Sequence, residues 1–296
     1  MSYSKVKAAN YSVVNDLMML FKFRLTITVV FSAILAYWIA LDSFSFNLSS
    51  VAILGLGGFC ITAAANTFNQ LLEKDFDKLM KRTENRPIAS GRISNTQAIL
   101  IAGLTSVVGV VLLASFNLST AFFGFVSMVL YSFIYTPLKR INSSAIPVGA
   151  IPGAMPVLIG CVAAQGEVTD LAIVLFSVQF FWQFPHFWAI GWLGYDDYKK
   201  AGFKFIPERN GQRDSMLGIY SVFYAFMLFP MIVILYLIGY AGIISLVGMS
   251  IMTLGYMYMG YVLHKNDDRK SALMLMFFSF FYLPLCLILL LSLIHI

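Results

Sequence analysis

The sequence predicts an all-α, polytopic membrane protein with about nine transmembrane helices. Of its 296 residues, 59% are hydrophobic and 11% are charged, and the mean hydropathy is +0.81. Ordinary soluble domains carry roughly 25% charged residues. The apolar runs recur at lengths near the about 20 residues that a helix needs to cross the hydrocarbon core. They are continuous, without the alternation that is typical of a β-barrel.

Nine apolar runs account for most of the chain. A short interfacial helix, within residues 13–21, is expected to lead into the first span. The third and fourth spans are divided only near Asn117, and the seventh and eighth only near residues 239–242. The predicted spans cover residues 25–42, 50–71, 97–116, 119–136, 145–164, 170–193, 215–238, 240–263 and 271–294.

The distribution of Lys and Arg predicts the orientation. With nine spans, all 20 of these residues fall on one side of the membrane, and the loops of the other face carry none. The positive-inside rule then places the N-terminus and the long polar loops in the cytoplasm. The net charge of +6 is therefore interpreted as a topology signal and not as nucleic-acid binding. We expect a cytoplasmic N-terminal segment, residues 1–24, and one transmembrane domain, residues 25–296.

A charged segment, "NQLLEKDFDKLMKRTENRP", ends the second span. Asn69, Glu73 and Asp77 are four residues apart, so a helix places them on one face. Oxygen ligands of this kind suit Mg²⁺. The cations that follow would bind phosphate oxygens. The alternative interpretation is a solvated helix end with pairs such as Asp77–Lys81. The phosphate-binding candidates are Lys81, Arg82 and Arg86.

Two further segments on the same side carry similar chemistry. The loop "GYDDYKKAGFKFIPERNGQR", residues 194–213, offers acidic residues followed by basic ones. Together with the first segment it would suit a diphosphate bridged by Mg²⁺. Between the two lies "YTPLKR", in which Tyr135 and Lys139 either form an interfacial belt or steady the anion and the developing cation. The candidates in the second loop are Asp197, Tyr198 and Lys200.

The sixth span contains polar residues at membrane depth. Gln183 and His186 lie in "FFWQFPHFWAIGW", and such residues usually face a cavity or the interior of a bundle. The histidine is either merely hydrogen-bonded or part of a pocket for a flat ring system, with Trp182, Trp188 and Trp192 as stacking surfaces. The Gly- and Pro-rich fifth span, residues 144–160, is expected to form a cavity wall.

These segments resemble the UbiA-type intramembrane prenyltransferases, and among them the protohaem IX farnesyltransferases. The similarity lies in four ordered segments: residues 66–94, "YTPLKR", "GAIPGAMPVLIG", and "WQFPHFWAI" followed by "YDDYKKAGFKFIP". Two motifs depart from the family pattern. Glu73 stands where Asp is commoner, and Ala201 and Leu193 leave Asp197 without the second Asp of a DxxxD pair. The resemblance implies helices around a central cavity.

The resemblance also implies a reaction. A farnesyl group would pass from farnesyl diphosphate to a vinyl group of haem B, making haem O in a bacterial inner membrane. Mg²⁺ would be the cofactor, and a haem A synthase or a terminal oxidase would use the product. The catalytic residues would be Asn69, Glu73, Asp77, Asp197, Tyr135 and Lys139, the first four of them binding the metal. The substrate-binding residues would be Lys81, Arg82, Arg86, Lys200, Gln183, His186, Trp188 and Tyr198.

Two other functions fit parts of the pattern. A prenyltransferase that acts on a quinone precursor or another aromatic acceptor would share the fold. The segment from Gln183 to His186 favours haem as the acceptor. A transporter would distribute polar groups through the depth of several spans, whereas the acidic residues here gather at one end.

Overall fold

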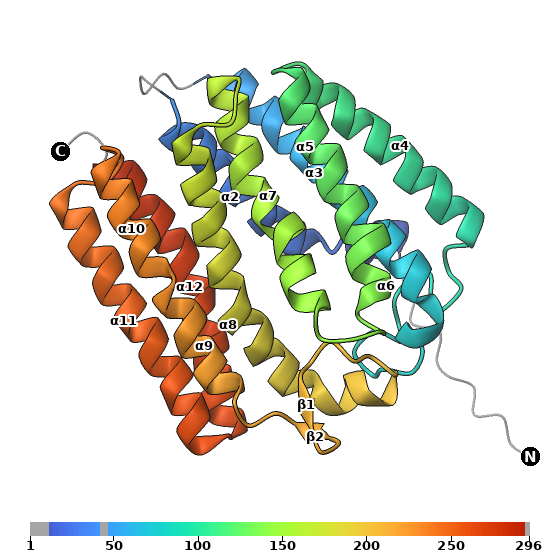
Figure 1. Ribbon diagram of the computed structural model, residues 1–296. Coiled ribbons are helices and arrows are strands. Elements are labelled where there is room, and N and C mark those ends of the chain that lie inside the picture. Colours follow the sequence, from blue (N-terminus) through green and yellow to red (C-terminus); the bar gives the residue numbers. More distant parts are fainter. Residues whose placement is uncertain (1–11, 42–46, 294–296) are drawn as a thin grey trace, which may run out of the picture.

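A computed structural model describes residues 12–41 and 47–293, and it is almost entirely helical (Figure 1). Eight helices are long and apolar enough to cross a membrane, and the bent pair α1 and α2 makes a ninth if it is counted as one span. The predicted all-α membrane architecture is therefore confirmed. The helices are α1 (Val13–Leu20), α2 (Phe23–Ile39), α3 (Leu48–Asp77), α4 (Asn95–Ala114), α5 (Leu118–Val129), the π-helical η1 (Leu130–Tyr135), α6 (Thr136–Leu138), α7 (Ala145–Gln165), α8 (Asp170–Lys200), α9 (Leu217–Phe226), α10 (Leu228–Leu237), α11 (Ile243–Asn266) and α12 (Arg269–Leu293).

Two helices continue beyond their predicted ends. Helix α3 runs to Asp77 and α8 to Lys200, so the two polar segments expected as loops from residues 72 and 194 begin as helix. Two residues after the end of α8 comes Gly202, whose φ of +76° favours glycine. The N–H of Phe203 then donates to the carbonyl of Tyr198 at 2.9 Å, as in a Schellman cap.

Two spans are interrupted. The fourth changes from α5 to the π-helical η1 and then to α6, and the seventh is broken at Met227 between α9 and α10. Pro230 has no N–H for the carbonyl of Phe226, which accounts for a break near that position. The segment after α8, expected to be a loop, also contains a short antiparallel hairpin of β1 (Glu208–Arg209) and β2 (Gln212–Arg213).

The first span and the N-terminal segment differ in detail from expectation. The predicted boundary at residues 24 and 25 falls inside α2, which begins at Phe23. Helices α1 and α2 meet at an angle of 52°. Residues 1–11 of the predicted segment lie outside the described residues.

Helix α7 lies at the centre of the bundle, between α2, α5 and α8 (Figure 1). In its most apolar stretch, 78% of the residues are buried, compared with 22% in α4. Gly160 allows α7 to pack directly on α2, because a Cβ at this position would lie 2.1 Å from the carbonyl oxygen of Ala33. By contrast, Leu100 and Leu104 of α4 are 67% and 68% exposed, which suits a surface in contact with lipid.

Candidate active site

The polar connections meet at one end of the bundle. Arg82, in the connection after α3, donates to the hydroxyl of Tyr198 at the end of α8, with a distance of 3.1 Å. The N–H of Lys204 donates to the carbonyl of Lys139, 2.8 Å away. The expectation that the two charged segments lie on the same side and near each other is therefore confirmed.

Helix α3 presents three oxygen-bearing side chains along one buried face. Asn69, Glu73 and Asp77 lie on successive turns and are 1%, 4% and 1% exposed. The amide nitrogen of Asn69 donates to Glu73 Oε2 and to the hydroxyl of Thr136, both at 3.0 Å. These two bonds turn the amide oxygen of Asn69 toward Lys22, which donates to it at 2.8 Å.

Both carboxylates of this face are paired with cations from later in the chain. Lys139 forms an ion pair with Glu73 Oε1, and its side chain is 12% exposed. Arg86 Nη1 lies 2.8 Å from each carboxylate oxygen of Asp77. Burying two carboxylates is costly unless each has a partner, so these pairs are a condition for the site to fold as it does.

The donor set fits Mg²⁺ in its chemistry. Two carboxylates and an amide oxygen are hard ligands, and Mg²⁺ commonly takes one or two carboxylates and completes its shell with water and phosphate. Within residues 12–41 and 47–293, no three His, Cys, Asp or Glu side chains lie close enough to hold a metal by themselves. Asp197, half-buried near the end of α8, therefore does not form such a group with Glu73 and Asp77.

Several residues that the sequence analysis missed support this face. Asn66 and Gln70, one turn apart on α3, are 2% and 0% exposed. Gln70 donates to the carbonyls of Met19 and Leu20 at 2.9 Å, and Asn66 donates to that of Phe21 at 3.1 Å. Carbonyls at a helix end need such partners. The sequence did contain an indication of this role, because Asn66 and Gln70 are two further amide side chains inside an apolar span.

The π-helical turn η1 places two tyrosines beside the charged face. Lys139 Nζ lies 4.9 Å from the ring centroid of Tyr135, and Lys22 Nζ lies 3.3 Å from the hydroxyl of Tyr131. The two rings are 5.5 Å apart. Thr136 closes the turn by donating to the carbonyl of Tyr131 at 2.8 Å. Short π-helical turns are frequent at functional sites because they shift the register of the side chains.

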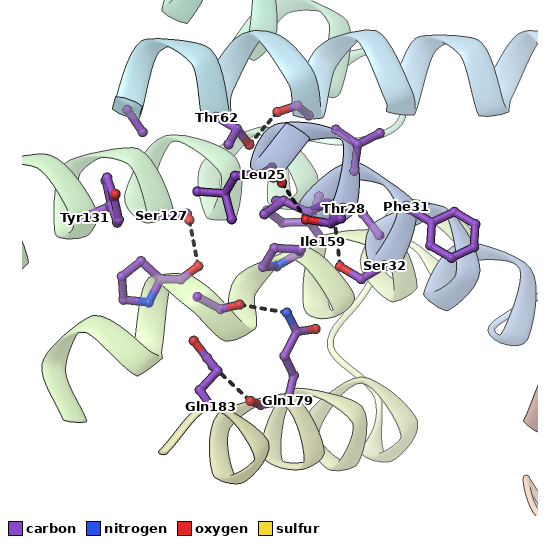
Figure 2. Close-up of a pocket in the computed structure, with 18 of the residues that line it drawn as sticks. Leu25, Thr28, Phe31, Ser32, Thr62, Ser127, Tyr131, Ile159, Gln179 and Gln183 are labelled. Atoms are coloured by element: carbon purple, nitrogen blue, oxygen red, sulfur yellow. Dashed lines mark hydrogen bonds between the residues drawn. The ribbon is translucent and has the colours of Figure 1, made fainter. Parts of the chain in front are cut away.

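An apolar cavity of about 330 Å³ extends from this end into the bundle (Figure 2). Its volume lies at the lower end of the range for ligand pockets, about 300–1,000 Å³. Tyr131 and Tyr135 line its polar end, so the cavity adjoins the charged face of α3. Its walls come from α2, α3, α5, α7, α8 and α12, with one residue of α4. The predicted central cavity is therefore confirmed.

Side chains of α5 and α8 donate to backbone carbonyls of α7 at the cavity wall. Pro156 has no N–H, so the carbonyl of Pro152 instead accepts from Ser127 of α5 at 3.2 Å. On the α8 side, Gln179 donates to the carbonyl of Gly153 at 2.8 Å, as Figure 2 shows. Gln183 donates to the carbonyl of Ala150 at 3.1 Å. The predicted cavity wall is thus a row of partnered carbonyls.

His186 also lines the cavity, in a defined tautomer. Its Nδ1 lies 2.7 Å from the hydroxyl oxygen of Ser279, and that hydroxyl donates its single proton to the carbonyl of Met276 at 2.5 Å. Nδ1 must therefore carry the proton that Ser279 accepts, which leaves the lone pair on Nε2. Trp182 stacks on the imidazole with centroids 5.1 Å apart.

The remaining predicted residues are distributed around this centre. Trp188 does not line the cavity; it is buried against Phe184 and Tyr224, and in the described part of the chain its Nε1 has no hydrogen-bond partner. Trp192 donates instead to Asp267 at the end of α11. Of the three tryptophans predicted as stacking surfaces, only Trp182 lies in the cavity wall. Three predicted substrate-binding residues, Lys81, Arg82 and Lys200, are exposed.

Comparison with known proteins agrees with this architecture. The profile of the UbiA prenyltransferase family matches residues 29–281. A protoheme IX farnesyltransferase from Flavobacterium johnsoniae is 42% identical over 270 residues, which cover 89% of each chain.

Two solved structures share the fold. A digeranylgeranylglyceryl phosphate synthase superposes with a TM-score of 0.78 at 16% identity, over 95% of this chain and 98% of the other. A UbiA homologue from Archaeoglobus fulgidus, bound to GPP and Mg²⁺, gives 0.64 at 13% identity, over 94% and 99%. From the profile match over most of its length and the identity to its relatives, this chain belongs to the UbiA prenyltransferase family and is an integral membrane prenyltransferase.

Proposed function

We propose that this chain transfers a farnesyl group from farnesyl diphosphate to a vinyl group of protohaem IX and so makes haem O. One observation carries the proposal: a buried row of Asn69, Glu73 and Asp77, faced by cations, lies next to the polar end of an apolar cavity. A diphosphate fits the first part and an isoprenoid chain fits the second. The name of the Flavobacterium johnsoniae relative supports haem as the acceptor.

The cations would hold the diphosphate. Arg86 and Lys139 already lie at the carboxylates, and Arg82 lies beside Tyr198. Guanidinium and ammonium groups bind phosphate oxygens through charge-assisted hydrogen bonds. Mg²⁺, when bound by Asn69, Glu73 and Asp77, would neutralise charge on the diphosphate and make it a better leaving group. Lys81, Asp197 and Lys200 would reach the site only as the connections close over the substrate.

The transfer would proceed by ionisation. The bond between C1 of the farnesyl group and the diphosphate oxygen breaks, and the electron pair leaves with the diphosphate. The rings of Tyr131 and Tyr135, at the polar end of the cavity, would stabilise the allylic cation. The π electrons of the vinyl group then form the new carbon–carbon bond. Water adds to the remaining cationic carbon and loses a proton, which leaves a hydroxyl group.

The wall formed by Gln183, His186 and Trp182 would receive the edge of the tetrapyrrole. The indole of Trp182 offers a flat apolar surface beside the Nε2 lone pair of His186. The amide nitrogen of Gln183 is bound to two backbone carbonyls, which holds this side chain in place. Trp188 packs behind this wall and would support Phe184. We assign His186 to haem orientation and the apolar part of the cavity to the farnesyl chain.

The location of the site follows from the charge distribution. The charged connections lie at one end, which we place in the cytoplasm by the positive-inside rule. We propose the inner membrane of a bacterium, by analogy with the relative from Flavobacterium johnsoniae. Haem O made there would leave to a haem A synthase or directly to a terminal oxidase. Haem B and haem O are both largely apolar, so a membrane enzyme is suited to take up the first and release the second.

The test is an assay of the purified protein in lipid nanodiscs with farnesyl diphosphate, Mg²⁺ and haem B. Mass spectrometry of the extracted haem should show haem B with one added farnesyl group and one hydroxyl group. A parallel reaction with 4-hydroxybenzoate tests the alternative acceptor. Farnesylation of 4-hydroxybenzoate without any change in haem would replace the proposal with a quinone-precursor prenyltransferase.

A further inference from the structure

We propose that Lys22 is a third diphosphate-binding cation, and that it occupies Asn69 until metal and diphosphate bind. This inference rests on the proposed function, because it assigns a further residue to the same site. The sequence analysis placed Lys22 only among the charges that set the topology. The structure instead brings it to α3, 47 residues along the chain, where it donates to the amide oxygen of Asn69 at 2.8 Å.

Each expected metal ligand on α3 is occupied by one cation. Lys22 binds the oxygen of Asn69, Lys139 pairs with Glu73, and Arg86 bridges both oxygens of Asp77. The three cations come from three separate parts of the chain: the break between α1 and α2, the connection after α3, and the end of α6. Each of the three side chains on α3 thus has its own cation. Lys22 holds the same kind of position as Arg86 and Lys139, which are already assigned to diphosphate binding.

Lys22 differs from the other two cations in the charge of its partners. Arg86 and Lys139 each have a carboxylate, but Lys22 bonds to an amide oxygen and a phenol oxygen, both neutral. When all these side chains are ionised, three cations face two carboxylates. A partly buried ammonium without a carboxylate gains most from an anion that arrives beside it. The site therefore carries one excess positive charge, which favours the binding of an anion.

The position of Lys22 is specified by its surroundings. Its φ of 46° and ψ of 54° lie in the left-handed region, which is costly for a residue with a side chain. Gln70 donates to the carbonyls of Met19 and Leu20 at the break. The carbonyl of Phe21 accepts from Asn66 at 3.1 Å and from Thr26 at 2.6 Å. A lysine that only extends its ammonium group to the membrane interface requires neither this backbone conformation nor these hydrogen bonds.

The proposal predicts opposite effects on the two ligands. A metal ion and Lys22 compete for the amide oxygen of Asn69, so removing the ammonium should tighten metal binding in the absence of diphosphate. The same change removes one phosphate-binding cation, so diphosphate should bind more weakly. A residue that merely supports the fold would weaken both ligands together.

The experiment uses the purified full chain in nanodiscs. Binding of Mn²⁺ alone is measured by electron paramagnetic resonance of the free ion, and binding of inorganic diphosphate at saturating Mg²⁺ by calorimetry. We compare Lys22→Met with Lys22→Arg, which keeps the charge, and with Arg24→Met, which removes an exposed charge two residues away. In Lys22→Met we expect diphosphate to bind roughly tenfold more weakly and Mn²⁺ to bind several-fold more tightly. Lys22→Arg should keep most of the diphosphate affinity, and Arg24→Met should change neither.

Unchanged diphosphate affinity in Lys22→Met would overturn the proposal, as would a parallel loss of both ligands in a folded variant. If Lys22→Met does not fold, Lys22→Gln keeps a donor for Asn69 without the charge and permits the same comparison. Failure of the proposed function is a different result: the unaltered protein would then leave haem B unfarnesylated in the nanodisc assay, whatever its affinity for inorganic diphosphate.

Discussion

A single guanidinium nitrogen of Arg86 lies 2.8 Å from both carboxylate oxygens of Asp77. The aspartate is 1% exposed, although it is the last residue of α3. The interpretation of this helix end as solvated charges with an Asp77–Lys81 pair is therefore wrong, since Lys81 is exposed and Arg86 takes that place. A buried carboxylate on the same helix face as Asn69 and Glu73, already beside a side chain of the type that binds phosphate, is suited to a metal-assisted departure of diphosphate.

Asp77→Asn should lower the rate of haem farnesylation at least 100-fold, because it removes the charge that would hold Mg²⁺ and Arg86 in place. Asp75→Asn is the matched control. Asp75 lies two residues away on the same helix, but its side chain is 68% exposed and pairs with Lys78 on the surface. The assay is haem O formation at saturating Mg²⁺, with membrane insertion checked by extraction. Full turnover in Asp77→Asn would remove this residue from the site.

Glu73→Gln should destabilise the protein by about 3 kcal/mol, because it leaves the ammonium of Lys139 without its carboxylate in a site that is largely closed to water. Lys139→Met should cost a similar amount. The double variant should lose clearly less than the sum of the two, since it removes the pair as a unit.

The measurement is unfolding of each variant in one detergent, followed by tryptophan fluorescence. The exposed pair of Asp75 and Lys78 serves as the comparison, with an expected coupling below about 1 kcal/mol. Simple additivity of the two buried changes would contradict the prediction. The double variant should regain stability without regaining turnover.

His186→Ala should weaken the use of haem about tenfold while leaving the KM for farnesyl diphosphate unchanged, because the imidazole is assigned to the acceptor. Ser279→Ala should have a smaller effect in the same direction, since it removes the acceptor that holds the proton on Nδ1. Ser279→Thr should retain the bond. Haem titration by absorbance and initial rates separate these cases. Unaltered haem affinity and turnover in His186→Ala would show that this histidine only packs against Trp182.

Gly153→Ala should impair activity and lower stability by about 1–3 kcal/mol, because the added methyl would lie 1.9 Å from Oε1 of Gln183 and must displace it from the cavity wall. Gly103→Ala, in helix α4, meets no atom within 4 Å and should be neutral or slightly stabilising, as alanine favours a helix. Thermal unfolding and the haem O assay are measured on both. Equal behaviour of the two variants would contradict the assigned contact.

Some of the site follows directly from local sequence. Asn69, Glu73 and Asp77 share a face because they are four residues apart on a helix, and that spacing needs no knowledge of other elements. The length of the helix did not follow: the polar composition after residue 71 suggested a loop, but continued backbone hydrogen bonding extends α3 to Asp77. Asn117, the weakest separator in the sequence, is an N-cap that accepts from the N–H of Thr120 at 2.8 Å.

The partners of the charged residues could not be read from spacing. Lys22 and Lys139 reach α3 across 47 and 66 residues, and the sequence alone offers nearer partners such as Lys81 for Asp77. The tryptophans illustrate the same limit. Three tryptophans in the sixth span have similar surroundings in the sequence, but only Trp182 faces the cavity, since the rotation of α8 about its axis depends on its packing against α7 and α12.

The sequence by itself determined the class of the protein: continuous apolar runs must form helices in lipid, because every backbone N–H and carbonyl has to be bonded within its own segment. It also determined which end of the bundle is charged and which residue types gather there. Only the tertiary structure decided which cation meets which oxygen and where the cavity lies. The physical reason is that these contacts join helices far apart in the chain, and their geometry depends on close approaches such as Gly160 of α7 against α2.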